Sequence, residues 1–177
     1  MLKSAIEAQP KSLVSRHARA IFEYFGHAFA LRRMCTVAVT KPEYIDEQID
    51  SIERAMIETL IATVFKVNDA IFRPFFIRLL DQCVPHQSKQ AEDQTLQSIT
   101  FFRFVASLSS RLQSIFTNYF GLMLEQISTI LATHAGKEAN AKVLQTSVLE
   151  AVSNSFKFDQ DGMSPTSWRP WINQPIN

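Results

Sequence analysis

Cysteine is scarce in this sequence, which argues against two kinds of stabilised domain. The 177 residues include two cysteines, Cys35 and Cys83, and neither belongs to a CxxC or Cys/His pattern. A disulfide framework or a structural zinc site needs several such residues at short, fixed spacings. We therefore expect both cysteines to be small apolar residues of a helical core in a reducing compartment.

The sequence also lacks an excess of charge of either sign. Lys and Arg number 18 and Asp and Glu 17, so the formal net charge is +1. A protein that attracts nucleic acid through its overall field carries a large positive excess. Any contact with RNA would therefore have to come from a local basic patch.

Long apolar runs are missing as well. A membrane-spanning helix needs about 20 consecutive apolar residues, and no stretch approaches that length. Residues 1–7 lack the apolar core of a secretory signal peptide. We expect an intracellular, soluble chain with no membrane contact.

Residues that form turns are few. The chain has four glycines and seven prolines, and three of the prolines fall within the last thirteen residues. No stretch alternates apolar and polar residues as a strand would. The sequence therefore predicts an all-α fold with long helices. The exception is an irregular tail over residues 162–177, which holds Trp168 and Trp171.

Apolar residues recur at helical spacings of three and four along the rest of the chain. We predict an N-terminal extension over residues 1–11 and a helical domain over residues 12–161, interrupted by a polar loop at residues 86–94. Within that domain, the expected helices cover residues 12–35, 40–65, 73–84, 95–134 with a bend near Thr117, and 137–158. The last helix is expected to turn five residues inward, namely Leu144, Val148, Leu149, Val152 and Phe156.

Local signals place several helix ends. Thr40 to Glu43 form a capping box with a proline in the first turn, and Ser12 can cap the first long helix. A break at Asn68-Asp69 precedes the central helix, with Asp69 or a neighbour as its cap. Because proline is best tolerated in a first turn, Pro74 predicts that the regular helix begins near Arg73. Pro85 and Ala135-Gly136 should end the helices before them.

Aromatic residues concentrate in the middle of the chain. Eight of the fourteen phenylalanines lie between Phe72 and Phe120, so this part is expected to be the packing centre. The apolar arc over residues 95–112 is wide, which predicts a helix covered by neighbours on two sides, as in stacked helical pairs. Gly26, in the middle of a predicted helix, suggests close approach of a neighbouring helix.

No residue pattern in the sequence indicates catalysis. The chain has no glycine-rich phosphate loop, no nucleophile elbow and no HExxH motif, so we expect neither an enzyme nor a cofactor or metal site. The remaining candidates are basic. Lys66, Arg73 and Arg78 flank the central helix, whereas Arg103 and Arg111 share a polar face with serines. Each of these side chains could bind RNA phosphate, or could instead pair with acids or cap carbonyls.

Four segments, in their order and spacing, resemble a known family. They are Val67–Asp81, Ile99–Phe104, Leu112–Phe120 and Ser155–Asp159. Together they are similar to the C-terminal region of the large HEAT-repeat protein of the small-subunit processome. That family is called U3 small nucleolar RNA-associated protein 10 in fungi and HEAT-repeat-containing protein one in animals. The resemblance covers residues 52–161.

The resemblance implies a HEAT-like α-solenoid piece built of stacked antiparallel helical pairs. It also implies a nucleolar scaffold within the U3 ribonucleoprotein that supports pre-rRNA processing and 18S rRNA maturation. Other processome proteins would be its partners, with direct or indirect contact to pre-rRNA or U3 snoRNA, and no small-molecule substrate. The matched positions are expected to shape a junction between helical pairs, namely Phe72, Arg73, Pro74, Phe75 and Phe76. Because the family's chains are much longer, we expect a fragment of a longer protein or a reduced relative.

Two alternatives to the nucleolar scaffold stay open at this point. The chain could be an autonomous helical RNA-binding module that uses Arg103, Arg111 and nearby lysines. It could also be an unrelated HEAT-type adaptor that works in the cytoplasm. The salt dependence of RNA binding and the cellular location would separate these possibilities.

Overall fold

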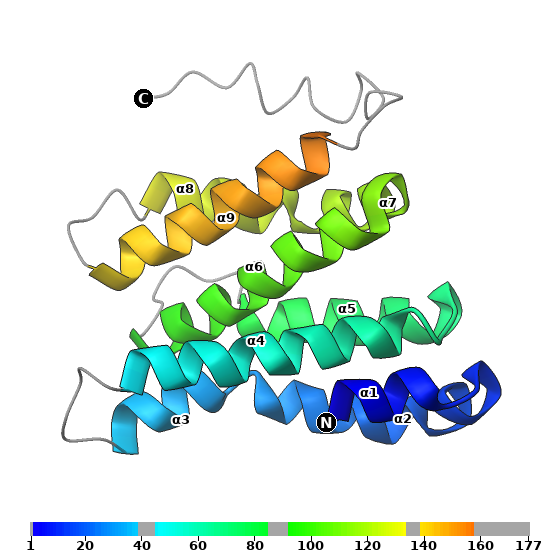
Figure 1. The fold of residues 1–177 in the computed structure, drawn as a ribbon. Coiled ribbons are helices and arrows are strands. Elements are labelled where there is room, and N and C mark those ends of the chain that lie inside the picture. Colours follow the sequence, from blue (N-terminus) through cyan, green and yellow to red (C-terminus); the bar gives the residue numbers. More distant parts are fainter. Residues whose placement is uncertain (1, 39–44, 85–91, 134–138, 158–177) are drawn as a thin grey trace. The chain divides into compact units, whose positions relative to one another are not determined.

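The computed structural model describes residues 2–38, 45–84, 92–133 and 139–157, and the account below concerns those residues. All regular structure within them is helical and none is strand (Figure 1). This confirms the all-α prediction. In chain order, the elements are α1 (Leu2–Ala8), α2 (Lys11–Ala28), α3 (Leu31–Ala38), α4 (Ile45–Val64), α5 (Asp69–Cys83), α6 (Glu92–Leu112), η1 (Gln113–Phe116), α7 (Thr117–Phe120), η2 (Gly121–Met123), α8 (Leu124–Thr133) and α9 (Ala139–Lys157).

The chain divides into two compact units, Met1–Phe104 and Val105–Asn177, with the boundary inside α6. In the first unit, α4 contacts α1, α2 and α3, and α2 also contacts α5. In the second unit, α7 lies between η1 and η2, and α9 contacts η1 and α8.

Phenylalanines form the centre of the first unit. Phe22 of α2 stacks on Phe75 of α5, with ring centroids 4.3 Å apart and ring planes 9° from parallel. Phe76 of α5 continues the cluster to Phe101 of α6 at 5.8 Å. Such ring pairs add stabilisation beyond the area that they bury. The predicted aromatic packing centre is therefore confirmed for this unit.

The first long helix differs from its prediction. Residues 12–35 were expected to form one helix, but α2 ends at Ala28 and α3 begins at Leu31. Phe29, at the break, is fully buried and packs edge-on against Phe104 at 5.7 Å. Ser12 lies inside α2, whose N-cap is Pro10 with no side-chain hydrogen bond, so the predicted cap is wrong.

The central helix α5 begins earlier than predicted. Asn68 is its N-cap, and its side-chain oxygen accepts a hydrogen bond from the Ile71 amide at 3.1 Å. The helix therefore starts at Asp69, and Pro74 falls in its second turn, where we had expected a start near Arg73. Pro74 removes the hydrogen bond that would reach the carbonyl of Ala70. Burial of the phenylalanines on either side of Pro74 offsets that loss.

Helix α6 confirms the expected wide apolar arc and corrects its ends. Every residue from Thr95 to Phe102 is buried. The helix starts at Glu92, inside the predicted polar loop, and it stops at Leu112. Gln113 then has a φ of 53°, a left-handed geometry that ends an α-helix. The break thus comes four residues before the predicted bend at Thr117.

In the second unit, the buried face of α9 differs from the expected one. Leu144 and Val148 are buried as predicted, but Leu149 is 54% exposed and Phe156 is 50% exposed. Small residues occupy the buried face instead, namely Ala141, Ser147, Ala151 and Ser155. Short side chains let a neighbouring helix come close, which an apolar pattern alone does not reveal.

Several predicted features lie outside the described residues. They are the capping box at residues 40–43, the helix ends at Pro85 and at Ala135-Gly136, and the tail over residues 162–177.

Candidate interaction site

The residues matched to the family lie in α5. Phe72, Phe75 and Phe76 are buried, and they form the α5 side of the aromatic centre described above. Arg73 is half-buried and Pro74 is exposed on the opposite side of the helix. The expected role of these positions at a junction between helical pairs remains a prediction.

Lys66, a candidate for RNA contact, is engaged within the fold. Its Nζ donates hydrogen bonds to the backbone oxygens of Glu7 and Gln9, at 2.7 and 2.8 Å. These carbonyls lie at the C-terminal end of α1, where a helix presents partial negative charge. The ammonium group therefore holds α1 against the end of α4.

Arg103, the second candidate, belongs to a group of four charged side chains that we call the charge cluster: Arg32, Asp50, Glu53 and Arg103. Arg103 donates from Nη1 to Asp50 Oδ1 at 2.7 Å and to Glu53 Oε1 at 3.3 Å. Arg32 donates to Glu53 Oε2 from Nε at 2.8 Å, and it also pairs with Asp50. The charge cluster thus joins α3, α4 and α6 with two positive and two negative groups.

Burial makes the charge cluster costly to disturb. The side chain of Glu53 is 3% exposed and that of Arg32 is 10% exposed. Partial burial alone would raise the pKa of Asp50, but hydrogen bonds from Arg103 and Arg32 outweigh it and lower that pKa. Burial of Arg103 would lower its pKa, yet the hydrogen bond to Asp50 and the charge of Glu53 raise it. The geometry therefore favours the ionised forms of Asp50 and Arg103.

Two further arginine candidates, Arg111 and Arg78, lie elsewhere. Arg111 is exposed in the last turn of α6. Arg78 is exposed on α5 and lines a cavity of about 220 Å³ beside Gly26 and Gln82. Gln82 Nε2 donates to the Gly26 oxygen at 3.2 Å. A methyl group at Gly26 would meet Gln82 Oε1 at 3.8 Å, which is ordinary contact. Within the described part of the chain, no helix therefore approaches Gly26 as closely as the sequence predicted.

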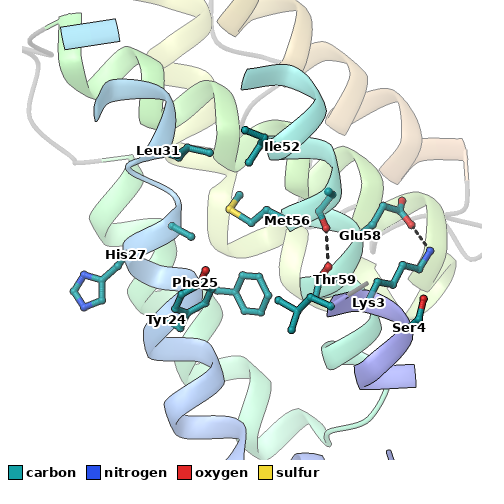
Figure 2. A pocket seen from close by; sticks show the side chains of 13 residues that line it. Lys3, Ser4, Tyr24, Phe25, His27, Leu31, Ile52, Met56, Glu58 and Thr59 are labelled. Carbon is teal, nitrogen blue, oxygen red and sulfur yellow. Dashed lines mark hydrogen bonds and ion pairs between the residues drawn. The ribbon is translucent and has the colours of Figure 1, made fainter. Parts of the chain in front are cut away.

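A larger hollow lies on the first unit, between α1, α2, α3 and α4 (Figure 2). We call it the groove, and its volume is about 710 Å³. Three of its lining side chains are large, apolar and more than half exposed: Leu2 at 54%, Tyr24 at 64% and Ile52 at 54%. Met56 and Leu31 complete one wall, as Figure 2 shows.

The polar groups of the groove are mostly paired with one another. Lys3 and Glu58 form an ion pair at 2.9 Å on its rim, and the Thr59 hydroxyl donates to the Ala55 carbonyl at 2.7 Å. In Figure 2 the His27 ring points away from the apolar wall. The groove therefore offers apolar surface rather than a set of converging reactive groups.

Sequence reasoning missed both the charge cluster and the groove. The groove needs α1, which falls in the segment expected to be a mere extension. The charge cluster pairs residues 18 to 53 positions apart, and no local sequence pattern links residues at such separations. Among the described residues, no group of three or more His, Cys, Asp or Glu side chains could hold a metal ion. No described helix has the length and apolar character to cross a membrane.

Comparison with known proteins gives one clear family. The family model of the BP28CT (NUC211) domain matches residues 13–164. U3 small nucleolar RNA-associated protein 10 of Aspergillus oryzae is 30% identical over 162 residues, which are 91% of this chain and 9% of the relative. The protein of the same name from Aspergillus niger is 31% identical over 160 residues, which are 89% of this chain and 9% of the relative.

A third relative extends the match nearly to both ends of the chain. U3 small nucleolar RNA-associated protein 10 of Neosartorya fischeri is 28% identical over 173 residues, or 97% of this chain and 10% of the relative. The chain thus spans about a tenth of the length of these relatives. No solved structure matches it. The matches confirm the family resemblance noted from the sequence.

Proposed function

Because the chain belongs to the BP28CT (NUC211) domain family, we propose that it is a scaffold subunit of the small-subunit processome. In this role it supports nucleolar pre-rRNA processing and 18S rRNA maturation as part of the U3 ribonucleoprotein. The observation that carries the proposal is the family match over residues 13–164. The names of the fungal relatives point to the same RNA-associated particle.

We further propose that the chain acts as a HEAT-like solenoid piece, whose antiparallel helical pairs present surfaces to other processome proteins. The paired helices of the first unit and the wide buried arc of α6 support this proposal. A scaffold of this kind needs surfaces for partners and no catalytic groups.

Protein contacts, rather than direct RNA contacts, carry the association in this proposal. Of the five basic side chains that could have bound phosphate, Lys66 is bonded to carbonyl oxygens and Arg103 to carboxylates. A guanidinium that already faces two acids gains little from a phosphate. The apolar groove is better suited to side chains of a protein.

Affinity purification of the tagged chain from the cells that express it, at low and at high salt, tests this function. We expect U3 snoRNA and processome proteins to be recovered together and to stay bound at high salt. The variant Ile52→Lys, which places a charge in the groove, should reduce recovery. The matched control Met34→Lys changes a residue that is 63% exposed and outside the groove, and it should recover the same partners.

Two results would contradict the proposal. RNA that is recovered at low salt and lost at high salt, without processome proteins, would favour an autonomous RNA-binding module, because phosphate contacts weaken steeply with salt. Recovery of cytoplasmic proteins alone would favour an unrelated HEAT-type adaptor.

A further inference from the structure

One face of α2 is polar from its first turn to its last. It carries five exposed residues at spacings of three and four, namely Ser12, Arg16, Arg19, Glu23 and His27. At 3.6 residues per turn, these side chains fall within an arc of roughly 80° around the helix. All of α2 is described, and its other residues, the apolar ones included, fall outside that arc.

Arg78 of α5 extends this polar face. Helices α2 and α5 contact each other through the stacked rings of Phe22 and Phe75. Beside that contact, Arg78 lines one small cavity together with Glu23 and His27. We call Arg16, Arg19 and Arg78 the arginine strip.

The guanidinium groups of the arginine strip are available to a ligand. All three residues are exposed, and in the described part of the chain no hydrogen bond or ion pair engages any of them. Lys66 and Arg103, by contrast, are bonded within the fold.

The arginine strip also concentrates positive charge. With Glu23 as the one acid of the face, its formal charge is 3 − 1 = +2, whereas the whole chain carries +1. The strip is therefore a local basic patch on a chain that is otherwise close to neutral.

We propose that the arginine strip binds the phosphate backbone of an RNA strand. The choice of RNA rests on the proposed function, which places the chain in an RNA-containing particle. The planar fork of arginine donates paired hydrogen bonds to phosphate oxygens. Arg16 and Arg19 start from Cβ positions about 5–6 Å apart, so both can reach the same stretch of backbone. Such contacts hold a strand without reading its bases, and they add to the protein contacts of the scaffold.

An acidic protein segment fits the arginine strip less well than RNA does. Protein interfaces combine a polar rim with an apolar core, and the polar arc of α2 holds no apolar side chain. A phosphate backbone needs only positive charge and hydrogen-bond donors. The apolar surface of the first unit lies in the groove, where Tyr24 is turned roughly 100° around α2 from the centre of the polar arc. Protein and RNA would therefore occupy different surfaces.

Fluorescence anisotropy of a labelled oligouridine RNA with the purified full chain tests this proposal. Arg19→Gln should weaken binding severalfold at low salt. It should also reduce the slope of log Kd against log salt by about 0.7, the value for one phosphate contact on a single strand. Glu23→Gln removes the acid from the face and should strengthen binding. Arg54→Gln, the matched control, makes the same charge change at an exposed arginine on α4 and should leave binding unchanged.

Three results would overturn the proposal. The native chain could fail to bind oligouridine, or Arg54→Gln could weaken binding as much as Arg19→Gln, which would reduce the effect to overall charge. An oligoglutamate peptide could bind as tightly as the RNA, which would assign the arginine strip to an acidic protein. Because the assay holds only the chain and its probe, its failure leaves the recovery of processome proteins from cells, and thus the proposed function, unaffected.

Discussion

At the scale of single residues, the members of the charge cluster contribute unequally to stability because they differ in burial. Glu53 is 2% exposed as a whole residue, and Arg32 covers it from one side while Arg103 reaches it from the other. A buried carboxylate that loses its partner pays the full cost of desolvation. Arg32 and Arg103 therefore contribute unequally, although both are arginines in the same cluster.

Removal of Arg32 should destabilise the fold more than removal of Arg103. We expect Arg32→Gln to lower the free energy of unfolding by about 3 kcal/mol, because Glu53 is left in a buried site. Arg103→Gln should cost about 1 kcal/mol, since the shorter bond of Arg103 is to Asp50, which is partly exposed to water, and Glu53 keeps its closer bond to Arg32. Chemical denaturation measures both. Arg54→Gln, an exposed arginine on α4, serves as the control, and equal losses for Arg32 and Arg103 would contradict the assignment.

Asp50 should make the stability of the protein depend on pH in the acid range. Its pKa in the folded state lies below the ordinary value of 3.8. The paired carboxylate therefore adds stability above that value, and this contribution is lost as the pH falls through the lower folded pKa. The free energy of unfolding, measured from neutral pH to pH values below 3.8, should decrease less steeply with falling pH for Asp50→Asn than for the native chain. Parallel curves would show that Asp50 is not held by the arginines.

Gly26 should tolerate a larger residue. It lies in α2, where glycine costs about 1 kcal/mol relative to alanine, and its neighbour leaves room for a methyl group. Gly26→Ala is expected to raise the free energy of unfolding by up to about 1 kcal/mol. Thermal unfolding measures the change. A loss of stability would mean that α2 needs glycine here for a reason other than space.

At the scale of elements, α1 depends on its neighbours for its existence. It has seven residues and none of them is buried, and an isolated helix of this length does not persist in water. The bonds from Lys66 to the Glu7 and Gln9 carbonyls and the pair of Lys3 with Glu58 hold it on α4. One wall of the groove therefore rests on a few polar contacts.

Loss of the Lys66 ammonium should loosen α1 alone. We expect Lys66→Met to speed hydrogen exchange of the amides in residues 2–8 and to leave α4 and α5 protected. Mass spectrometry of peptides after exchange resolves the two regions. Lys11→Met replaces an exposed lysine at the start of α2 and should change neither. Uniformly faster exchange would instead assign Lys66 to the stability of the whole first unit.

The elements also show how far the sequence could predict the structure. Helix type and the aromatic centre follow from apolar spacing and composition, so these predictions succeeded. The break at Phe29 was missed because packing of Phe29 on Phe104 overrides the periodic pattern. A cap near Asp69 was predicted, but Pro74 led us to place the start of the helix at Arg73, whereas the Asn68 cap starts it at Asp69. In α9, the hydroxyls of Ser147 and Ser155 bond back to carbonyls four residues earlier. These hydrogen bonds satisfy the buried serine hydroxyls. A prediction based on apolar periodicity does not include serines in the core.

The candidate site was harder to predict than the fold. Arg103 and Lys66 were singled out as basic residues, but their partners lie 53 and 59 residues away in the sequence. Only the packing of helices brings such residues together. The groove depends in the same way on α1, which has no buried residue of its own to reveal its position.

At the scale of the whole molecule, the two units share α6 and hold different kinds of surface. The first unit, Met1–Phe104, carries the charge cluster and the groove, and the second, Val105–Asn177, carries α9. The family match runs through both. The chain spans about a tenth of the length of its relatives, so these surfaces correspond to one region of those proteins.

The two cysteines should report the opening of the first unit. Cys83 is fully buried, and burial raises the pKa of its thiol to about 12, whereas Cys35 is half-exposed. At neutral pH the accessible Cys35 should react quickly with a thiol reagent. Cys83 should react only as the unit unfolds, because the thiolate is the reactive form. Mass spectrometry of labelled peptides under increasing urea follows both. Rapid labelling of Cys83 in native buffer would contradict its burial.

The charge cluster also has a consequence for how the helices find their register. The apolar side chains of α4 repeat every three or four residues. If α4 were shifted by one helical turn relative to α3 and α6, it would therefore present a similar apolar surface. Glu53, however, has one position along α4 at which both arginines reach it. In any shifted register, the Glu53 carboxylate would be buried in an apolar environment without its arginine partners. We infer that the charge cluster fixes the register of α3, α4 and α6, because hydrophobic packing alone would allow several alignments of these helices.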